Sequence, residues 1–169
     1  MFQNEYDTRN SLAIGRRAEK KFKDLAIRRG YSVALPLHRQ DYEEHWDIRI
    51  RKGKRSFLVD VKAMKRLKGE IQDLWVWVEI VNIAGKPGWI YRTHAHFIAF
   101  ETMSGFVLVK PEELRNIVAE RVERKVVKFP EHAHYCLYQR DGRDDVITLV
   151  SMADIKSVSE KIWEERTWI

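Results

Sequence analysis

The chain has 169 residues, 33% of them charged, and a formal net charge of +6. This length predicts one domain with a substantial buried core, and the positive charge permits an anionic partner without requiring one. The single cysteine, Cys136, excludes an internal disulfide framework. Because no apolar run is long enough to span a bilayer and residues 1–11 lack an apolar signal core, we expect a soluble, cytoplasmic protein with no membrane partner.

The first predicted element is a helix over residues 11–29, with Ser11 as its N-cap and Gly30 as its stop signal. Residues 1–10 are polar and are expected to be loosely held. Four apolar residues at helical spacing form the buried face of the helix, and five basic residues crowd the same segment. The apolar residues are Ile14, Ala18, Phe22 and Leu25, and the basic ones are Arg16, Arg17, Lys20, Lys21 and Lys23.

A β-hairpin over residues 47–62 follows a short predicted strand at residues 31–35 and a polar loop at residues 38–44. Ile48 and Ile50 alternate with arginines in the first strand of the hairpin, and residues 52–54 form its turn. In the second strand, Phe57, Val59 and Val61 alternate with Leu58, Asp60 and Lys62. This period of two is typical of a strand pair that buries one of its faces.

Three ionisable side chains of the hairpin are expected to converge. Since side chains alternate faces along a strand, Asp60 and Lys62 project to the same side. Asp47 opens the neighbouring strand, so strand pairing brings its carboxylate next to that of Asp60. Two carboxylates repel each other unless a cation lies between them, and hard oxygen ligands suit Mg²⁺ or Mn²⁺. The hairpin therefore predicts a metal site with a lysine beside it.

The middle of the chain is predicted to add a basic turn at residues 64–69, a strand, a hairpin and a helix. Residues 74–83 are continuously apolar and aromatic, which predicts a central strand with Trp75, Trp77 and Glu79 on one face. We expect the tryptophans to pack under a helix, with stacking on an unpaired base as the alternative, and Glu79 to be a further acid near the metal site. Residues 94–100 and 106–109 form the hairpin, and Pro111 begins the helix, which runs to about Val122.

The last third of the chain is predicted to contain strands at residues 126–129, 135–139 and 146–150, with Asp141 and Gly142 as the turn between the last two. The chain then ends in a short predicted helix with an apolar side formed by Ile155, Val158, Ile162 and Trp163. Two histidine pairs, His94/His96 and His132/His134, lack a cysteine pair or a third ligand of suitable spacing, so we expect no zinc site. There is no internal repeat.

The pattern of Asp47 followed by Asp60-x-Lys62 resembles the motif of the PD-(D/E)XK nuclease superfamily, with Trp46 at the position of the motif's proline. The layout of residues 9–66, with Gly15 four residues before Glu19, is most similar to archaeal-type Holliday-junction resolvases. Those resolvases carry a serine in the loop before the first aspartate, and residues 38–44 have no clear counterpart of it.

For the fold, the resemblance implies an α/β protein with a restriction-endonuclease-like mixed β-sheet flanked by helices. It implies one nuclease domain over residues 1–169, with a core at about residues 11–122. A C-terminal extension at about residues 123–169 would add a β-hairpin and a short helix.

For the activity, the resemblance implies hydrolysis of DNA phosphodiester bonds with Mg²⁺, for which Mn²⁺ would substitute. Asp47, Asp60, Glu19 and the carbonyl of Val61 would hold the metal, and Lys62 would orient or deprotonate the attacking water. The expected substrate is a four-way DNA junction cut by a homodimer, because a junction presents two symmetry-related strands. The residues expected to hold the DNA are Arg16, Arg17, Lys20, Arg39, Lys65, Arg66 and Lys68.

Several alternatives stay open. The chain could be a nuclease of the same chemistry with another DNA target, of restriction, repair or exonuclease type, or a catalytically silent module that binds DNA by its shape. The basic run could be a solvated helix face on which Glu19 pairs with Lys20 or Lys23, and the loop with His38 and Arg39 could have no role. Finally, Asp60 and Lys62 could form an ordinary ion pair in a protein that does not bind DNA.

Overall fold

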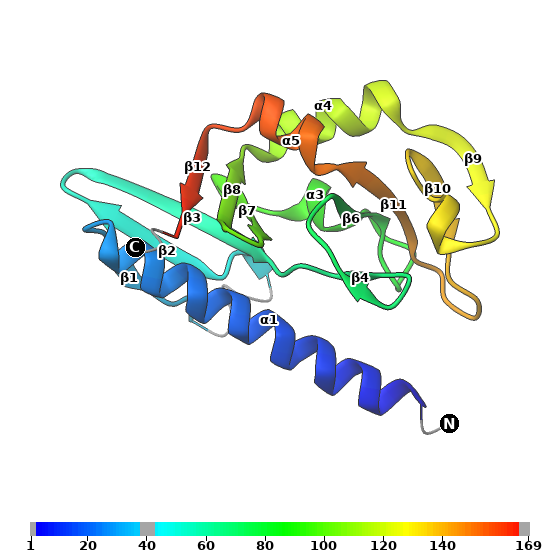
Figure 1. Ribbon diagram of the computed structural model, residues 1–169, viewed down its shortest axis with the longest axis horizontal. Coiled ribbons are helices and arrows are strands. Elements are labelled where there is room, and N and C mark those ends of the chain that lie inside the picture. Colours follow the sequence, from blue (N-terminus) through cyan, green and yellow to red (C-terminus); the bar gives the residue numbers. More distant parts are fainter. Residues whose placement is uncertain (1–2, 38–42, 166–169) are drawn as a thin grey trace.

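A six-stranded mixed sheet forms the centre of the molecule (Figure 1). The computed structural model describes residues 3–37 and 43–165. The strands lie in the order β1-β2-β3-β7-β8-β12, in which β3 and β7 are parallel and every other neighbouring pair is antiparallel. Their bounds are β1 (Ser32–Ala34), β2 (Ile48–Lys52), β3 (Arg55–Lys62), β7 (Phe97–Thr102), β8 (Gly105–Val109) and β12 (Lys161–Glu164). Helices flank this sheet, so the predicted mixed α/β class is confirmed.

The long helix α1 (Gln3–Arg28) covers one face of the sheet. Its predicted apolar face is confirmed at Ala18, Phe22 and Leu25, which are buried in one core with Ile48, Ile50, Val59 and Val61, whereas Ile14 is half-buried. The predicted start at Ser11 is wrong, since the helix begins at Gln3. No glycine or proline lies between residues 3 and 14, so nothing in that segment stops the helix. The chain leaves the helix at Gly30, whose φ of 81° is readily adopted by glycine.

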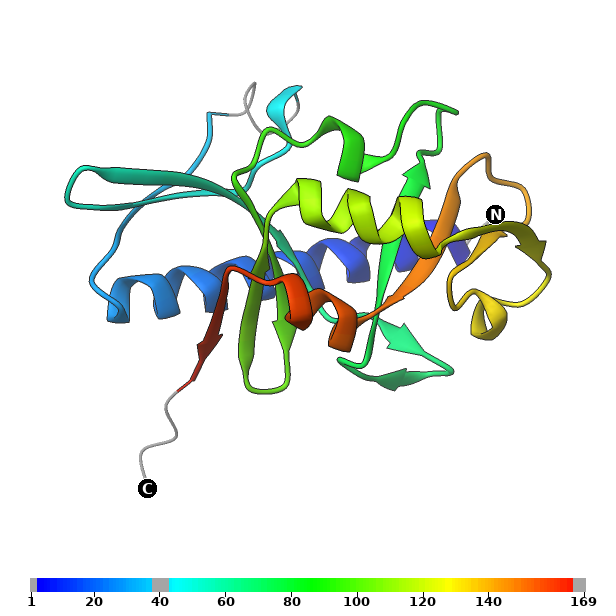
Figure 2. The same ribbon diagram turned by 90° about the horizontal axis from the view of Figure 1, so that it is seen from above.

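The other face of the sheet is covered by three shorter helices and a second sheet (Figure 2). The helices are α3 (Trp89–Arg92), α4 (Pro111–Arg121) and α5 (Met152–Val158). Ile98 and Phe100 of β7 enter this second core, whereas Phe97 and Ala99 enter the first. By the same alternation, Val59 and Val61 of β3 face α1, so Asp60 and Lys62 project to the side of α3 and the second sheet.

The second sheet has the order β6-β11-β10-β9, so β6 (Trp75–Val81) lies at its edge and the prediction of a central strand is wrong. Val76, Val78 and Ile80 pack into the second core, as predicted for one face of β6. On the other face, Trp75 contacts the rings of His134 and Tyr135 with centroids 4.2 and 5.9 Å away, and Trp77 lies near Tyr138, so aromatic rings and not a helix cover the tryptophans. Both faces of β6 are thus packed although it is an edge strand, which explains its continuous apolar sequence. The remaining elements are β9 (Glu123–Val127), β10 (Cys136–Gln139), β11 (Val146–Ser151), the small hairpin of β4 (Arg66–Leu67) and β5 (Glu70–Ile71), and the 3-10 helix η1 (Pro130–His132).

The C-terminal segment contains a helix and a strand where one helix was predicted. α5 ends at Val158, and β12 then pairs with β8 at the edge of the main sheet. In β12, Trp163 is buried while its neighbour Ile162 is 49% exposed, which is the alternation of a strand. Burial of Trp163 against α1 therefore decides the conformation of this segment. β11 likewise pairs with β6, so segments after residue 123 complete both sheets.

Candidate functional site

Asp47 lies immediately before β2 and binds the backbone of β3. Its N–H donates to the carbonyl of Val59 at 2.9 Å, and its Oδ2 accepts the N–H of Val61 at 2.6 Å. Because β2 begins only at Ile48, the Asp47 carboxylate, and not a backbone carbonyl of β2, accepts the N–H of Val61. This places the Asp47 carboxylate on the edge of β3 at the level of Val61.

Trp46, at the position of the proline in the predicted motif, anchors this segment. Its side chain is 1% exposed, and its Nε1 donates to the carboxylate of Glu44 at 2.6 Å. The guanidinium carbon of Arg49 lies 5.3 Å from the centroid of the indole ring. A buried aromatic residue next to Asp47 therefore fixes where the chain enters β2.

Asp60 and Lys62 form an ion pair on the side of β3 that faces α3. Lys62 Nζ lies 2.7 Å from Asp60 Oδ1, as expected for two residues on one strand face. The ammonium also lies 4.5 Å from the ring centroid of Trp89, the first residue of α3. Asp60 is 3% exposed, and its second oxygen, Oδ2, is buried without a hydrogen-bond partner among residues 3–37 and 43–165. Asp60 thus keeps an unsatisfied acceptor in the interior.

The pKa of Asp47 shows that the predicted acids act on one another. Burial raises this pKa, the charge of Asp60 raises it further, and Glu19 adds a smaller contribution, so that it reaches about 8. Lys62 and the N–H of Val61 act in the opposite direction but do not compensate. Asp47, Asp60 and Glu19 therefore share one region of negative potential, with Glu19 as the most weakly coupled of the three.

Lys62 responds to the same potential. Burial alone would lower the pKa of its ammonium, but Asp60, Asp47 and Glu79 outweigh that effect, and the pKa of Lys62 rises. The pKa of Glu79 is raised, mainly by burial, although its carboxylate accepts the N–H of Trp89 at 3.2 Å and feels the charge of Lys62. Glu79 of β6 therefore joins this site from the second sheet.

The donor set suits a hard cation. Within residues 3–37 and 43–165, no three His, Cys, Asp or Glu side chains are arranged to hold a metal ion. Mg²⁺ is commonly bound by one or two carboxylates and completes its octahedron with waters or phosphate oxygens. Asp47 and Asp60 supply two carboxylates, and the carbonyl of Val61 lies on the strand edge that Asp47 contacts. A cation bound at Asp60 Oδ2 would give this oxygen the partner that it lacks in the described residues.

Glu101 of β7 is a buried acid that the sequence interpretation did not identify. It is 3% exposed, it accepts the N–H of Met64 at 3.1 Å, and it lies 3.5 Å from Lys21 Nζ and 3.9 Å from Arg17. Through Glu101, the basic face of α1 is tied to the start of the basic turn at residues 64–69. A glutamate directly after the buried run of residues 97–100 was the available signal.

The residues predicted to hold DNA lie on two neighbouring exposed segments. Arg16, Arg17 and Lys20 are exposed on α1, and Lys65, Arg66 and Lys68 are exposed around β4. Several have local partners, since Lys20 pairs with Asp24 at 2.8 Å and Arg66 donates to the carbonyl of Gly69 at 2.7 Å. The predicted contacts of His38 and Arg39 lie outside the described residues.

The histidine pairs occupy separate structural positions. His96 Nδ1 accepts the N–H of Leu58 at 2.9 Å, so it supports the edge of β3. His134 packs on Trp75, and burial together with nearby Lys68 and His132 lowers its pKa. His94 and His132 are exposed. Backbone contact and packing thus account for one histidine of each pair, His96 and His134.

Comparisons of the chain with protein-family models, curated proteins and solved structures gave no match. Among the helices of the described segments, none has the length and apolar character needed to cross a membrane. The predicted cytoplasmic location and the predicted homodimer remain predictions.

Proposed function

We propose that this chain is a divalent-metal-dependent endodeoxyribonuclease with a restriction-endonuclease-like fold, of the PD-(D/E)XK type, and that its substrate is a four-way DNA junction. The observation that carries the proposal is the group of Asp47, Asp60 and Lys62 at one end of the β2–β3 pair. In this group the ammonium of Lys62 pairs with Asp60 and acts electrostatically on Asp47, and, among the described residues, Asp60 Oδ2 is buried without a hydrogen-bond partner. An ordinary buried ion pair would satisfy both oxygens of its aspartate.

A divalent cation held by Asp47 and Asp60 fits this arrangement. It would neutralise the repulsion that raises the pKa of Asp47 and would give Asp60 Oδ2 a partner. The carbonyl of Val61 and, more weakly, Glu19 are the further ligands that the resemblance assigns. When bound, such a cation supplies a Lewis acid for the phosphate and lowers the pKa of a coordinated water.

Lys62 is proposed to act as a fixed cation and not as the base. Because its pKa is raised, it stays protonated at neutral pH, and the contact with Trp89 holds its ammonium in place. A protonated lysine beside the reacting phosphate stabilises the negative charge that develops in the transition state. Of the two roles implied by the resemblance, orienting the attacking water is therefore favoured over deprotonating it.

The proposed DNA surface combines the basic residues of α1 with those around β4. Glu101 connects these two segments, and the exposed cations can contact successive phosphates. Because each neutralised phosphate releases counterions, the logarithm of the binding constant should fall with the logarithm of the salt concentration, with a slope of roughly −0.9 per phosphate on duplex arms. A homodimer would present two such surfaces to the two symmetric strands of a junction.

The test is Mg²⁺-dependent cleavage of a synthetic four-way junction, compared with linear duplex, flap and single-stranded DNA of matched sequence. Asp60→Asn and Lys62→Met should each reduce cleavage by about 100-fold or more while leaving junction binding in EDTA unchanged. Matched controls are Asp141→Asn in the β10–β11 turn and Lys54→Met in the β2–β3 turn, both exposed and outside the proposed group.

The outcomes separate the alternatives. Undiminished cleavage by Asp60→Asn and Lys62→Met would refute the proposed centre. Preferential cleavage of a linear or flap substrate would support the metal-dependent cleavage but identify a DNA target other than the four-way junction. Junction binding without cleavage in Mg²⁺ or Mn²⁺ would identify a silent binding module, and the absence of any salt-sensitive DNA binding would refute the function altogether.

A further inference from the structure

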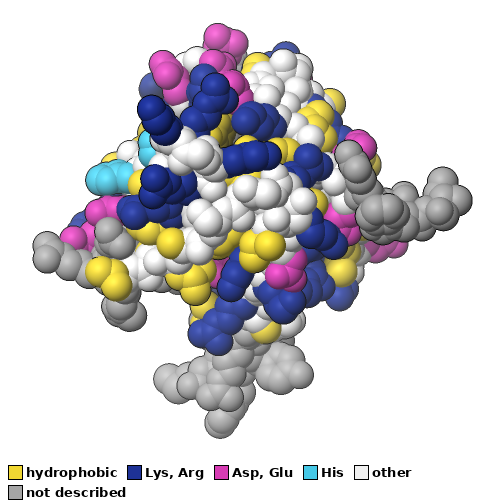
Figure 3. All heavy atoms as spheres, turned by 90° about the vertical axis from the view of Figure 1, so that its left-hand side faces the viewer, with side chains coloured by type: hydrophobic (Ala, Val, Ile, Leu, Met, Phe, Trp, Pro, Cys, Tyr) yellow, Lys and Arg dark blue, Asp and Glu magenta, His cyan; other side chains and the backbone are white. Residues whose placement is uncertain are grey.

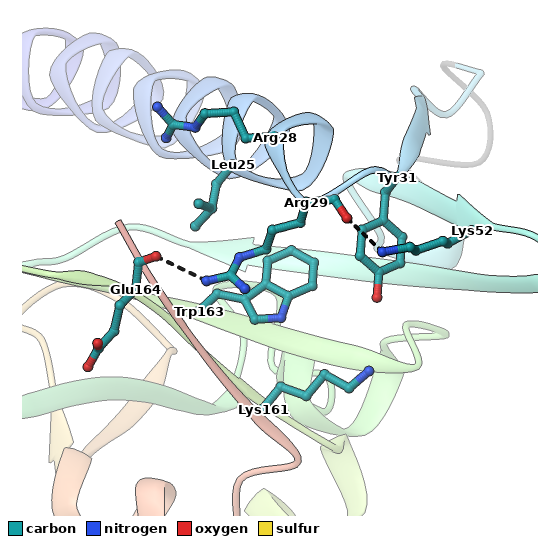
Figure 4. Close-up of a pocket in the computed structure, with 8 residues that line it drawn as sticks. All are labelled: Leu25, Arg28, Arg29, Tyr31, Lys52, Lys161, Trp163 and Glu164. Atoms are coloured by element: carbon teal, nitrogen blue, oxygen red, sulfur yellow. Dashed lines mark hydrogen bonds between the residues drawn. The ribbon is translucent and has the colours of Figure 1, made fainter. Parts of the chain in front are cut away.

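A second site lies at the opposite end of β2 from Asp47. It is a pocket of about 580 Å³ between the C-terminal end of α1, the β2–β3 hairpin and β12 (Figure 4). Four cationic side chains line it, Arg28, Arg29, Lys52 and Lys161, against one acidic residue, Glu164. Figure 3 shows the end of the molecule that carries the β2–β3 hairpin, where Lys and Arg side chains gather. The pocket is therefore electropositive and large enough for a small ligand.

Aromatic rings lie beside two of these cations, Arg29 and Lys52. Trp163 is stacked on Phe22 with ring centroids 5.3 Å apart and an interplanar angle of 8°. The guanidinium carbon of Arg29 lies 5.3 Å from the Trp163 ring centroid, and Lys52 Nζ lies 5.4 Å from that of Tyr31. Since the rings are covered by side chains of the protein itself, the pocket offers charge and not an open stacking platform.

The hydrogen bonds of the cations leave donors unused. Lys52 Nζ donates to the carbonyl of Arg29 at 2.9 Å, and Arg29 donates from its NH2 nitrogen to the carbonyl of Glu164 at 3.0 Å (Figure 4). Arg29 Nε is buried and has no hydrogen-bond partner in the described segments. Within the described part of the chain, none of Arg29, Lys52 and Lys161 forms an ion pair with a carboxylate, and Figure 4 shows the Glu164 carboxylate pointing away from the Arg29 guanidinium. The positive charge of the pocket is therefore not neutralised internally.

We propose that this pocket binds a phosphomonoester, carried by a free nucleotide or by the phosphorylated end of a nucleic-acid strand. A phosphomonoester has a charge of about −1.5 to −2 and three acceptor oxygens, which match a pocket lined by several cations better than a carboxylate does. The volume of the pocket exceeds that of the phosphate and leaves room for the group that bears it. Because the aromatic faces are covered, binding should depend strongly on the phosphate and only weakly on the identity of the base.

The pocket is separate from the Asp60 centre, and the inference does not rest on the proposed nuclease function. Asp47 precedes β2 and Lys52 ends it, so five residues at about 3.3 Å each place the two sites roughly 17 Å apart along the strand. The pocket lies on the α1 side of the sheet, among residues of the first core, whereas Asp60 and Lys62 project to the other side. Each site can therefore be tested while the other is disabled.

The experiment measures binding in EDTA with the full chain carrying Asp60→Asn, so that cleavage cannot interfere. The probes are AMP, adenosine, and one single-stranded oligonucleotide with either a 5′-phosphate or a 5′-hydroxyl. The phosphorylated member of at least one pair should bind about tenfold or more tightly than its unphosphorylated counterpart. Lys52→Ala should abolish most of that difference, while Lys52→Arg should retain it.

Lys54→Ala is the matched control, because it removes an exposed lysine from the same hairpin without touching the pocket. Selective binding of AMP would identify a free nucleotide as the ligand, and selective binding of the 5′-phosphorylated strand would identify a strand end. Equal affinity for phosphorylated and unphosphorylated probes would overturn the inference. So would equal losses in Lys52→Ala and Lys54→Ala, since these would indicate general charge attraction.

Discussion

Replacing Asp47 with asparagine should change the pH dependence of stability in a defined way. In the folded protein the pKa of Asp47 is about 8, against 3.8 in the absence of the fold, because of burial and the neighbouring Asp60. Between about pH 4 and pH 7 the folded protein keeps a proton that the unfolded chain has lost, so the free energy of unfolding of the metal-free wild type falls as pH rises. At 1.36 kcal/mol per unit, the loss attributable to Asp47 by pH 7 is on the order of 4 kcal/mol.

The Asp47→Asn variant lacks this titration, while its amide oxygen can still accept the N–H of Val61. In EDTA the variant should therefore match the wild type near pH 4 and exceed its free energy of unfolding by up to about 4 kcal/mol near pH 7. Urea unfolding followed by tryptophan fluorescence at a series of pH values measures the difference. Adding Mg²⁺ near pH 7 should stabilise the wild type and not the variant, because binding requires the ionised carboxylate.

A difference between the two proteins that does not change from about pH 4 to pH 7 would refute the reasoning, because it would mean that Asp47 titrates alike in the folded and unfolded states. A variant less stable than the wild type near pH 7 would show that Lys62 lowers the pKa of Asp47 by more than burial and Asp60 raise it. Either result would remove the electrostatic argument for two interacting carboxylates at this site.

Three further substitutions test contacts of the fold by thermal unfolding, where 1 kcal/mol corresponds to about 2–4 °C for a chain of this size. Glu101→Ala should cost about 2–3 kcal/mol, because it leaves the N–H of Met64 without its acceptor and removes one of the two carboxylates that pair with Lys21, whereas Glu160→Ala in an exposed ion pair should cost at most about 1 kcal/mol. Trp163→Ala should cost about 3–5 kcal/mol because it empties the space between α1 and β12, and Ile162→Ala on the exposed side of the same strand should have little effect. Ser151→Ala should cost about 1 kcal/mol by removing the N-cap of α5, and equal melting temperatures would contradict that role.

The local geometry of the site followed from the sequence where strand periodicity decides it. Asp60 and Lys62 are two residues apart on one strand, so any regular strand places them on the same face, and their 2.7 Å contact agrees. The coupling of Asp47 to Asp60 followed from antiparallel pairing across a short turn. By contrast, the start of α1 and the conformation of residues 161–164 were predicted wrongly. At the start of α1, Ser11 suggested an N-cap, but the helix continues through it to Gln3. At residues 161–164, the apolar spacing suggested a helix, but burial of Trp163 favours a strand.

By itself, the sequence determined the elements whose patterns are local: the buried face of α1, the β2–β3 hairpin and the side of β3 on which the acid and the lysine lie. Only the tertiary structure decided which distant groups surround them, namely Trp89 over Lys62, Glu79 from β6, and Glu101 between α1 and the turn after β3. It also created the basic pocket, whose residues come from the end of α1, β2 and β12 and span more than one hundred positions of the chain. The physical reason is that periodicity fixes the direction of a side chain relative to its own element, whereas its neighbours depend on how separate elements bury their apolar faces against one another.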